Sequence, residues 1–423
     1  MEEDMSSLWS FYKTLESQPF NRIGARLLQI GVGAVILYRT VTELPFAQYL
    51  YGPDGPAIGS TITWLGPIGV WVDTVFYSAW GVYLTLALWG LGGLGLILGF
   101  RPRLSTLLAL IGSLLVELRG NTGDGGDNIL RLLLLYMLFF HPRIEQLSAT
   151  ASGTAVFSHN IGVIAVYAQL IILYLVSATT KLQGEVWING TAAYYVTQLD
   201  SYGPPWASVR ELFKNPWITT LATYSTIFYQ LFFPAMLLAP PTFYSLWTVF
   251  GILLHLSFAI LMGLVTFSAV MISLLLFTLG DKEWALLAQV TKRWIPKLIV
   301  FVDSDCPYCS WTGRWIKRMD LLGLFLVTPY RTDMSFRRYN LDLEAVDREM
   351  HVVRQLGDKY RIFRGFDAVV AVIKHLPPLW PVLPIAVLLQ LSGLGPKLYR
   401  WLADHRILVT AGSCQGESCP IKR

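Results

Sequence analysis

Long apolar stretches fill the first two thirds of the chain, and a shorter mixed pattern of apolar and polar positions follows them. Each stretch is long enough, or nearly long enough, to cross the hydrocarbon core of a bilayer as a helix. Proline and glycine residues mark the turns between the stretches. The pattern predicts an α-helical integral membrane bundle of about eight spans, at residues 24–44, 74–99, 104–118, 129–140, 161–182, 217–239, 243–261 and 264–280.

The last part of the chain predicts a small α/β domain. An apolar, β-branched run at residues 298–302 is typical of a buried strand, and residues 310–320 carry apolar positions at helical spacing. A second strand is expected at 322–329, a mostly solvated segment at 341–357 and a helix from 360 to 375. The predicted organisation is an N-terminal interfacial segment, a transmembrane domain, a connector, the α/β domain and a flexible tail, at residues 1–22, 23–280, 281–296, 297–410 and 411–423.

Composition agrees with a membrane location. Hydrophobic residues make up 54% of the chain and charged residues 14%, whereas a soluble domain carries about a quarter charged residues. The mean hydropathy is +0.49. The net charge of +5 is modest and indicates no nucleic-acid partner, because basic flanks of membrane spans account for it. The acidic first residues lack a basic n-region, so the first span is expected to act as its own insertion signal.

Lysine and arginine residues are unevenly distributed between the predicted loops. With the N-terminus inside, the inner loops hold more basic residues than the outer loops, and the outer loop at residues 45–72 holds none. Cytoplasmic loops carry such an excess of positive charge. We therefore expect a multi-pass protein of the cell (inner or cytoplasmic) membrane, with both termini and the α/β domain in the cytoplasm.

Two cysteines separated by Pro307 and Tyr308 lie where the first predicted strand turns into a helix. The N-terminus of a helix carries partial positive charge, so it favours the thiolate of Cys306, and the thiolate is the nucleophile. Cys309 is then placed to resolve a mixed disulfide. This is thioredoxin-type redox geometry. Two alternatives remain: a zinc site, because zinc-binding knuckles use the same spacing, and an inert pair of cysteines.

The pattern Asp303-x-x-Cys306-x-x-Cys309 after a strand resembles the DCC family of thiol-disulfide oxidoreductase-like proteins. The helical segment at residues 399–406 is also similar to the closing helix of that family. The resemblance covers about residues 297–408 and implies a thioredoxin-like fold, in which Asp303 belongs to the catalytic set. Ser304 stands where the family usually has glycine, so a backbone of positive φ at this position would be strained.

Polar side chains within the apolar region are candidate functional groups, because charge is costly in a bilayer. Asp124 and Asp127 lie in a Gly-rich stretch that predicts either an outer hairpin of paired charges or a lined polar cavity. Lys181 ends a span shortly before Trp187; it is either a snorkelling anchor or a desolvated base. His255, in the middle of a span, is either hydrogen-bonded core or a catalytic group.

The run at residues 174–192 resembles the HTTM domain, the membrane domain shared with vitamin K-dependent γ-carboxylases. The helix of His255 and the stretch at 123–131 are similar to that family as well, so the resemblance covers about residues 15–280. In the carboxylases a lysine that ends the matching span is the proposed base on the reduced quinone. The resemblance gives that place to Lys181. Because no large extracytoplasmic substrate domain is predicted here, carboxylation itself is not implied.

Three functions are compatible with the sequence. The first is a membrane thiol-disulfide oxidoreductase whose Cys306/Cys309 dithiol exchanges electrons with a redox protein or with a quinone-like partner. In that case a polar pocket around Lys181, His255, Asp124, Asp127 and Trp187 would hold the quinone. The second is a carboxylase- or epoxidase-like enzyme with Lys181 as base. The third is a non-enzymatic membrane scaffold or immunity-type protein with a degenerate redox domain.

Two further cysteines, Cys414 and Cys419, lie in the predicted flexible tail. They are either incidental, a shuttle dithiol that exchanges with Cys306 and Cys309, or part of a four-thiolate metal site. The sequence makes no prediction about oligomeric state.

Overall fold

The computed structural model of the chain describes residues 13–53, 55, 65–119, 123–142, 153–320, 323–356 and 359–410. The chain divides into two compact units, Met1–Glu283 and Trp284–Arg423. Most of the predicted interfacial segment at 1–22 and all of the predicted tail at 411–423 lie outside the described residues. The same holds for the cysteine pair Cys414 and Cys419.

Every described element of the first unit is a helix. Its long helices coincide with the apolar stretches, because apolar residues without charge form a helix that satisfies all of its own backbone hydrogen bonds. The helices are α2 (Arg22–Glu43), α3 (Ala47–Tyr51), α4 (Pro67–Phe76), α5 (Gly81–Leu98), α6 (Pro102–Arg119), α7 (Gly125–Met137), α8 (Gly153–Lys181), α9 (Glu185–Ile188), α10 (Ala192–Gln198), α11 (Ala207–Leu212), α12 (Pro216–Met236), α13 (Pro241–Met262) and α14 (Val265–Thr278).

The count of about eight spans is not confirmed. Among the described residues, four helical stretches are long and apolar enough to cross a membrane: Arg22–Tyr51, Gly81–Leu98, Gly153–Lys181 and Pro241–Met262. A fifth is added if Val265–Thr278 and Asp281–Leu287, which meet at 94°, form one bent span. The apolar stretch predicted at 74–99 is not one helix, because α4 ends at Phe76 and α5 begins at Gly81.

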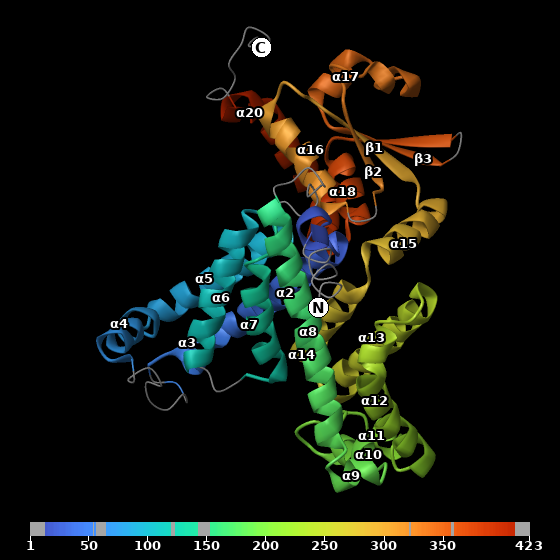
Figure 1. The fold of residues 1–423 in the computed structure, drawn as a ribbon. Helices are drawn as coiled ribbons and strands as arrows, with labels where there is room; N and C mark the ends of the chain where they lie inside the picture. Colours follow the sequence, from blue (N-terminus) through green and yellow to red (C-terminus); the bar gives the residue numbers. More distant parts are fainter. Residues whose placement is uncertain are drawn as a thin grey trace. The chain divides into compact units, whose positions relative to one another are not determined.

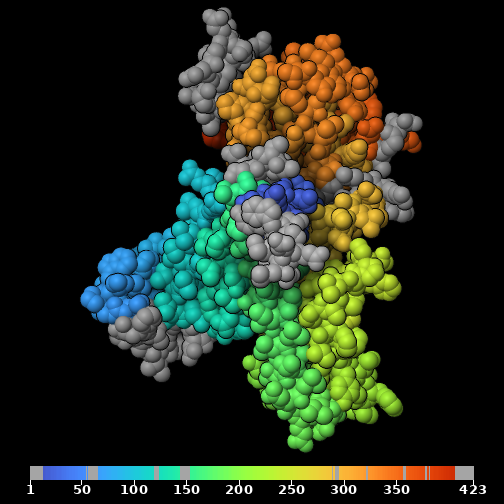
Figure 2. All heavy atoms as spheres, in the orientation of Figure 1, coloured from blue at the N-terminus to red at the C-terminus, as the bar shows by residue number. Residues whose placement is uncertain are grey.

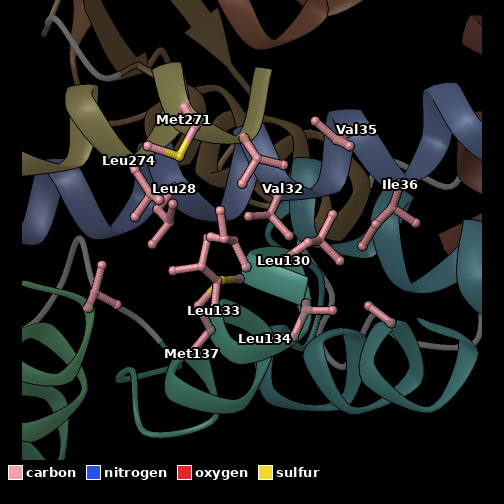
Figure 3. Packing of buried hydrophobic residues seen from close by; sticks show 14 of the residues in the cluster. Leu28, Val32, Val35, Ile36, Leu130, Leu133, Leu134, Met137, Met271 and Leu274 are labelled. Carbon is pink, nitrogen blue, oxygen red and sulfur yellow. The ribbon is translucent and has the colours of Figure 1, made fainter. Parts of the chain in front are cut away.

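The core of the first unit is built around α2. Side chains of α2, α7 and α14 converge there, as Figure 3 shows for Leu28, Val32, Leu133 and Met271, each of which is buried. Glycines bring the neighbouring helices α5 and α6 close together. A Cβ added to Gly92 of α5 would clash with the backbone nitrogen of Ala109 in α6, so a larger residue would force the helices apart.

A second helical group of the first unit comprises α8 to α13. Helix α12 contacts α8, α10 and α13, and the short helices α9 to α11 connect α8 to α12. In Figure 2 this group (green to yellow-green) extends away from the group of α4 to α7 (blue to teal), and the two groups meet where α8 contacts α7. The second group contains the lysine that the sequence singles out.

The second unit is built on a four-stranded sheet in the order β2-β1-β3-β4. β1 pairs in parallel with β2, whereas β3 is antiparallel to both β1 and β4. Helix α16 contacts β1 and β2, and α18 contacts β3 and β4 (Figure 1). The elements are α15 (Asp281–Trp294), β1 (Lys297–Val302), α16 (Pro307–Met319), β2 (Phe325–Pro329), α17 (Leu343–Arg348), β3 (His351–Leu356), β4 (Lys359–Arg364), α18 (Gly365–His375), α19 (Leu383–Leu391) and α20 (Leu394–Thr410).

Two sequence predictions for this unit are wrong. Residues 341–357 are not a mostly solvated segment: they form α17 and the central strand β3, in which Val352 and Val353 are fully buried. The helix expected from residue 360 begins at Gly365, because residues 359–364 form the edge strand β4. Both strands carry polar side chains, so the sequence pattern did not identify them as strands. Successive side chains of a strand point to opposite faces of the sheet, so each layer of the core receives only every second residue of β3.

One face of the sheet carries a core of its own. Phe301 and Val353 point from β1 and β3 towards Phe336, which lies in a 3₁₀ helix at Met334–Tyr339 and has no exposed surface. The rings of Phe301 and Phe336 meet edge to face, with their centroids 6.2 Å apart. The redox motif therefore follows a strand that is buried on both faces.

We expect Phe336→Ala to lower the free energy of unfolding of the second unit by about 3–5 kcal/mol, because it leaves a cavity in this core. Hydrogen exchange of the β1 and β3 amides in the full-length protein in detergent would measure the loss. Leu343→Ala is the matched control, since Leu343 is 44% exposed and its truncation should change stability by less than about 0.5 kcal/mol. Equal protection in the two variants would contradict the assigned core.

Candidate functional site

Cys306 is the N-cap residue of α16, directly after the turn that follows β1. Its backbone is extended, with φ −92° and ψ 113°, and its carbonyl accepts the first helical hydrogen bond from the backbone N–H of Ser310, at 2.9 Å. Pro307 occupies the first helical position, where the missing N–H leaves no partner unsatisfied. Both Cys306 and Cys309 are thiols and both are half-buried.

The surroundings of Cys306 stabilise its thiolate. A hydrogen bond from the Cys309 thiol, with further bonds from the backbone N–H groups of Cys309 and Tyr308, lowers the pKa of Cys306 to about 6. Partial burial and the carboxylate of Asp303 oppose this shift without cancelling it. At neutral pH Cys306 is therefore mostly thiolate, the form that attacks disulfides.

Asp303 is held by a bidentate ion pair with Arg331. The Nε and Nη2 atoms of Arg331 lie 2.6 and 2.8 Å from the two carboxylate oxygens of Asp303. Burial disfavours ionisation of Asp303, but the hydrogen bonds from Arg331 and from the backbone N–H of Asp305 outweigh it, so the pKa of Asp303 is lowered. The predicted catalytic role of Asp303 stays a prediction. The ion pair fits a residue that positions the turn better than one that transfers protons.

Arg331 is a residue that the sequence analysis missed. It lies just beyond the end of β2, and its Nη2 also donates to the carboxylate of Asp347, at 2.9 Å. That carboxylate accepts a second bond from the hydroxyl of Tyr330, at 2.6 Å. Because parallel strands end at the same edge of a sheet, the pairing of β1 with β2 is the signal that brings Arg331 to Asp303.

Ser304 fits the turn without strain. Among the described residues other than glycine, positive φ occurs at Asn21, Arg101 and Asn340, so Ser304 does not adopt the left-handed conformation. The carbonyls of Asp303 and Ser304 accept bonds from the hydroxyl of Ser310, at 3.3 and 3.1 Å. The replacement of glycine by serine is therefore compatible with the geometry of the motif.

A cavity of about 260 Å³ adjoins Cys309. Its walls are mainly apolar and come from β1, α16, α18 and α20, together with the chain around α17. The lining residues are Phe301, Val302, Asp303, Tyr308, Cys309, Thr312, Tyr330, Val346, Glu349, Met350, Phe366, Val369, Leu398, Tyr399, Leu402 and Ala403. The dithiol therefore lies beside a cavity that can accommodate an apolar group.

Comparison with known proteins agrees with this geometry. Residues 300–411 match the family model described as DCC1-like thiol-disulfide oxidoreductase. The second unit thus carries a DCC1-like thiol-disulfide oxidoreductase domain. The match begins within β1 and includes Cys306, Cys309 and Arg331. The resemblance of the helical unit to the HTTM domain stays a prediction.

Two curated proteins of Bacillus subtilis (strain 168) are similar to part of the chain. The uncharacterized protein YitO is 27% identical over 197 residues, which are 43% of this chain and 62% of YitO. The sporulation-delaying protein SdpB is 24% identical over 216 residues, 49% of this chain and 65% of SdpB. The chain spans less than two thirds of the length of either relative. No solved structure matches the chain.

Lys181 and Trp187 lie together on a second cavity, in the helical unit. The cavity has a volume of about 420 Å³ and lies among α8, α10, α12 and α13. The Nζ atom of Lys181 is 2.5 Å from the hydroxyl oxygen of Ser177 and 5.1 Å from the centre of the Trp187 ring. Gln230 also lines the cavity, and its buried Oε1 atom has no hydrogen-bond partner among the described atoms.

None of His255, Asp124 and Asp127 is among the residues that line this cavity, and their predicted grouping with Lys181 stays a prediction. His255 is buried among aromatic rings, and its Nε2 lies 3.0 Å from the hydroxyl oxygen of Tyr174. Asp124 caps α7, and Asp127 forms a buried ion pair with Arg39.

Arg39 organises a charge cluster that the sequence analysis missed. Besides Asp127, it binds Glu43, whose carboxylate also accepts a hydrogen bond from Tyr51 at 2.6 Å. Nearby, Arg131 pairs with Glu117 at 2.7 Å. The Gly-rich stretch therefore supplies paired charges, while the side chain of Arg119 lies outside the described residues. The partner in α2 could not be foreseen, because it is distant in sequence.

The described residues contain no group of three or more His, Cys, Asp or Glu side chains arranged to hold a metal ion. The four-thiolate alternative involves Cys414 and Cys419 and so falls outside the described part of the chain.

We expect alkylation of Cys306 to be half-maximal near pH 6 in the reduced full-length protein, as measured by peptide mass spectrometry after brief iodoacetamide pulses. Cys309→Ala should move the midpoint upwards, towards the ordinary thiol value of about 8.5, because it removes the largest stabilising hydrogen bond. Asp303→Asn should move it downwards, because it removes a negative charge that opposes the thiolate. A wild-type midpoint at or above about 8.5 would contradict the site.

Proposed function

We propose that the chain is a membrane-bound thiol-disulfide oxidoreductase whose active dithiol is Cys306 and Cys309. The observation that carries this proposal is the position of Cys306 at the start of α16, where hydrogen bonds lower its pKa to about 6. The DCC1-like family match supports it for the second unit. The apolar helices of the first unit support the membrane location.

The chemistry follows from the two thiols. The Cys306 thiolate attacks a disulfide of the partner, forms a mixed disulfide and expels one partner thiolate. Cys309, which follows within one helical turn, then attacks the sulfur of Cys306 and releases the second partner thiol. Two electrons pass to the partner, and Cys306 and Cys309 become a disulfide. The same steps run in reverse when the partner is the reductant.

The role of Arg331 in this chemistry is to fix the turn. Its bidentate bond to Asp303 joins the chain before Cys306 to the end of β2, so the first turn of α16 is presented in one conformation. Truncating Arg331 would leave the carboxylate of Asp303 buried without its main partner, which is strongly unfavourable.

The basic loops favour a cytoplasmic location for the redox domain. In that reducing compartment Cys306 and Cys309 cycle between thiol and disulfide and do not form a permanent bridge. The partner is a redox protein or a lipophilic, quinone-like molecule in the membrane.

The cavity beside Lys181 favours a second, additional function: binding of a lipophilic ligand such as a quinone. Its volume of about 420 Å³ falls within the range of about 300–1,000 Å³ typical of ligand sites. Lys181, Ser177 and the unpartnered Oε1 of Gln230 supply polar groups in a mostly apolar wall. A quinone, when bound, would supply two-electron chemistry, and Lys181 would donate a hydrogen bond to it. The HTTM resemblance agrees with such a ligand.

The oxidoreductase proposal is tested by redox titration of purified full-length protein in detergent, with free thiols read out by a mass-tagging reagent. We expect one pair to titrate as a two-electron couple at about −200 to −230 mV, in the range of glutaredoxins. Cys306→Ser should abolish this couple, while Lys181→Ala should leave it unchanged. Thiols that remain reduced across the whole range would refute the proposal and favour a non-enzymatic scaffold.

The ligand proposal has its own test, because the cavity can be filled. Ala193 lines it, so Ala193→Trp should displace a bound lipophilic molecule. We expect quinone extracted with the purified protein, measured by absorbance, to fall at least tenfold in this variant and several-fold in Lys181→Ala. Cys306→Ser should retain the wild-type amount. Equal quinone content in all variants would argue against the cavity as its site.

A further inference from the structure

The proposed dithiol leaves two cysteines without a role, Cys414 and Cys419, in the sequence CQGESCPIKR at residues 414–423. This segment follows α20, and α20 itself lines the cavity beside Cys309 through Leu398, Tyr399, Leu402 and Ala403. We propose that segment 411–423 is an internal redox partner of the Cys306/Cys309 dithiol, with Cys419 exchanging with Cys306 while Pro420 and Ile421 occupy the cavity. This inference rests on the dithiol function proposed above.

The size of the cavity fits a few side chains. An apolar cavity of about 150 Å³ accepts a benzene molecule, and whole small-molecule sites typically measure about 300–1,000 Å³. At about 260 Å³ the cavity has room for one or two apolar side chains and is small for a complete lipophilic cofactor. Pro420 and Ile421, which directly follow Cys419, are such side chains.

The charge of the cavity fits the same segment. Glu349 and Asp303 are among its lining residues, whereas none of the residues lining it is a lysine or arginine. The nearby guanidinium of Arg331 is already surrounded by Asp303, Asp305 and Asp347. The net charge of the side chains in and near the cavity is therefore negative. It complements Lys422 and Arg423, and it disfavours an anionic thiol such as glutathione in spite of the CPYC motif.

The chain is long enough for the exchange. Helix α20 continues for seven residues beyond Ala403, which places its last residue, Thr410, about 10 Å further along the axis. Cys419 lies nine positions beyond Thr410, and an extended chain over nine positions spans about 30 Å. Cys414 lies four positions beyond Thr410, which gives a span of about 13 Å. The chain before Cys419 is therefore much longer than the return path to the cavity requires, whereas the chain before Cys414 is barely long enough.

The exchange balances without any other reactant. When Cys414 and Cys419 form a disulfide, the Cys306 thiolate attacks the sulfur of Cys419, the Cys414–Cys419 bond breaks and Cys414 leaves as a thiolate that takes up a proton. Cys309 then loses its proton and attacks the sulfur of Cys306, and the Cys306–Cys419 bond breaks with release of the Cys419 thiolate. Two electrons have passed from the Cys306/Cys309 pair to the Cys414/Cys419 pair, and the reverse sequence returns them.

The experiment traps the mixed disulfide in full-length Cys309→Ser protein in detergent. The protein is reduced, freed of reductant, oxidised with limiting diamide and alkylated, and its disulfide-linked peptides are identified by mass spectrometry. We expect a Cys306–Cys419 linkage whose yield does not change when the protein is diluted 100-fold. Adding Cys414→Ser should preserve this linkage. Adding Cys419→Ser should reduce linkage to the segment at least tenfold, because Cys414 alone reaches poorly.

A second variant tests docking separately from thiol chemistry. In the Cys309→Ser background, Ile421→Ser combined with Lys422→Glu and Arg423→Glu should slow formation of the linkage about tenfold, and raised salt should slow it in the parent. The matched control is the same triple change in the chain with all four cysteines, in which Cys306 and Cys309 should still titrate as a couple.

The outcomes separate the two proposals. If Cys306 and Cys309 titrate reversibly but no Cys306–Cys419 linkage forms, or if its yield rises with protein concentration, the internal relay is refuted and the dithiol function stands. If the docking changes leave the rate unaltered, the cavity is not the site of the segment. If neither pair titrates, both proposals fail together.

Discussion

The ion pair between Arg331 and Asp303 is the interaction on which the geometry of the redox motif depends. It links the ends of β1 and β2, two parallel neighbours, through two charge-assisted hydrogen bonds. Asp303 also accepts a bond from the backbone N–H of Asp305, so the turn between strand and helix is held from both sides. The helix start, and with it Cys306, is fixed before any partner binds.

Local pattern was sufficient to predict most of the long helices of the first unit, but not the number of spans, and it predicted the strand–turn–helix around the cysteines. Apolar residues in long runs have one solution in a bilayer, which is a helix. Local pattern was insufficient for β3, because His351, Arg354 and Gln355 suggested a solvated segment. Tertiary pairing on both sides makes it a central strand all the same. A strand that mixes buried and polar residues without regular alternation is recognised only when its neighbours are known.

The candidate sites also divide into residues that short motifs reveal and residues that only the fold brings together. Cys306, Cys309 and Lys181 were found because their chemistry is visible in short motifs. Arg331 and Arg39 were missed because each meets its carboxylate partner across 28 and 88 positions of sequence, respectively. The predicted grouping of Lys181 with His255 depends on which faces of the helices meet, and short motifs do not reveal that. In the structure His255 belongs to an aromatic core and Lys181 to a cavity.

The strand order of the second unit has a consequence for its behaviour at high protein concentration. The outer strand β4 carries Lys359, Arg361 and Arg364 along its short length, and the opposite outer strand ends at Pro329. Positive charge and proline discourage a foreign strand from joining a sheet. Copies of the domain at high local concentration therefore resist edge-to-edge aggregation, even while their reactive thiols stay accessible.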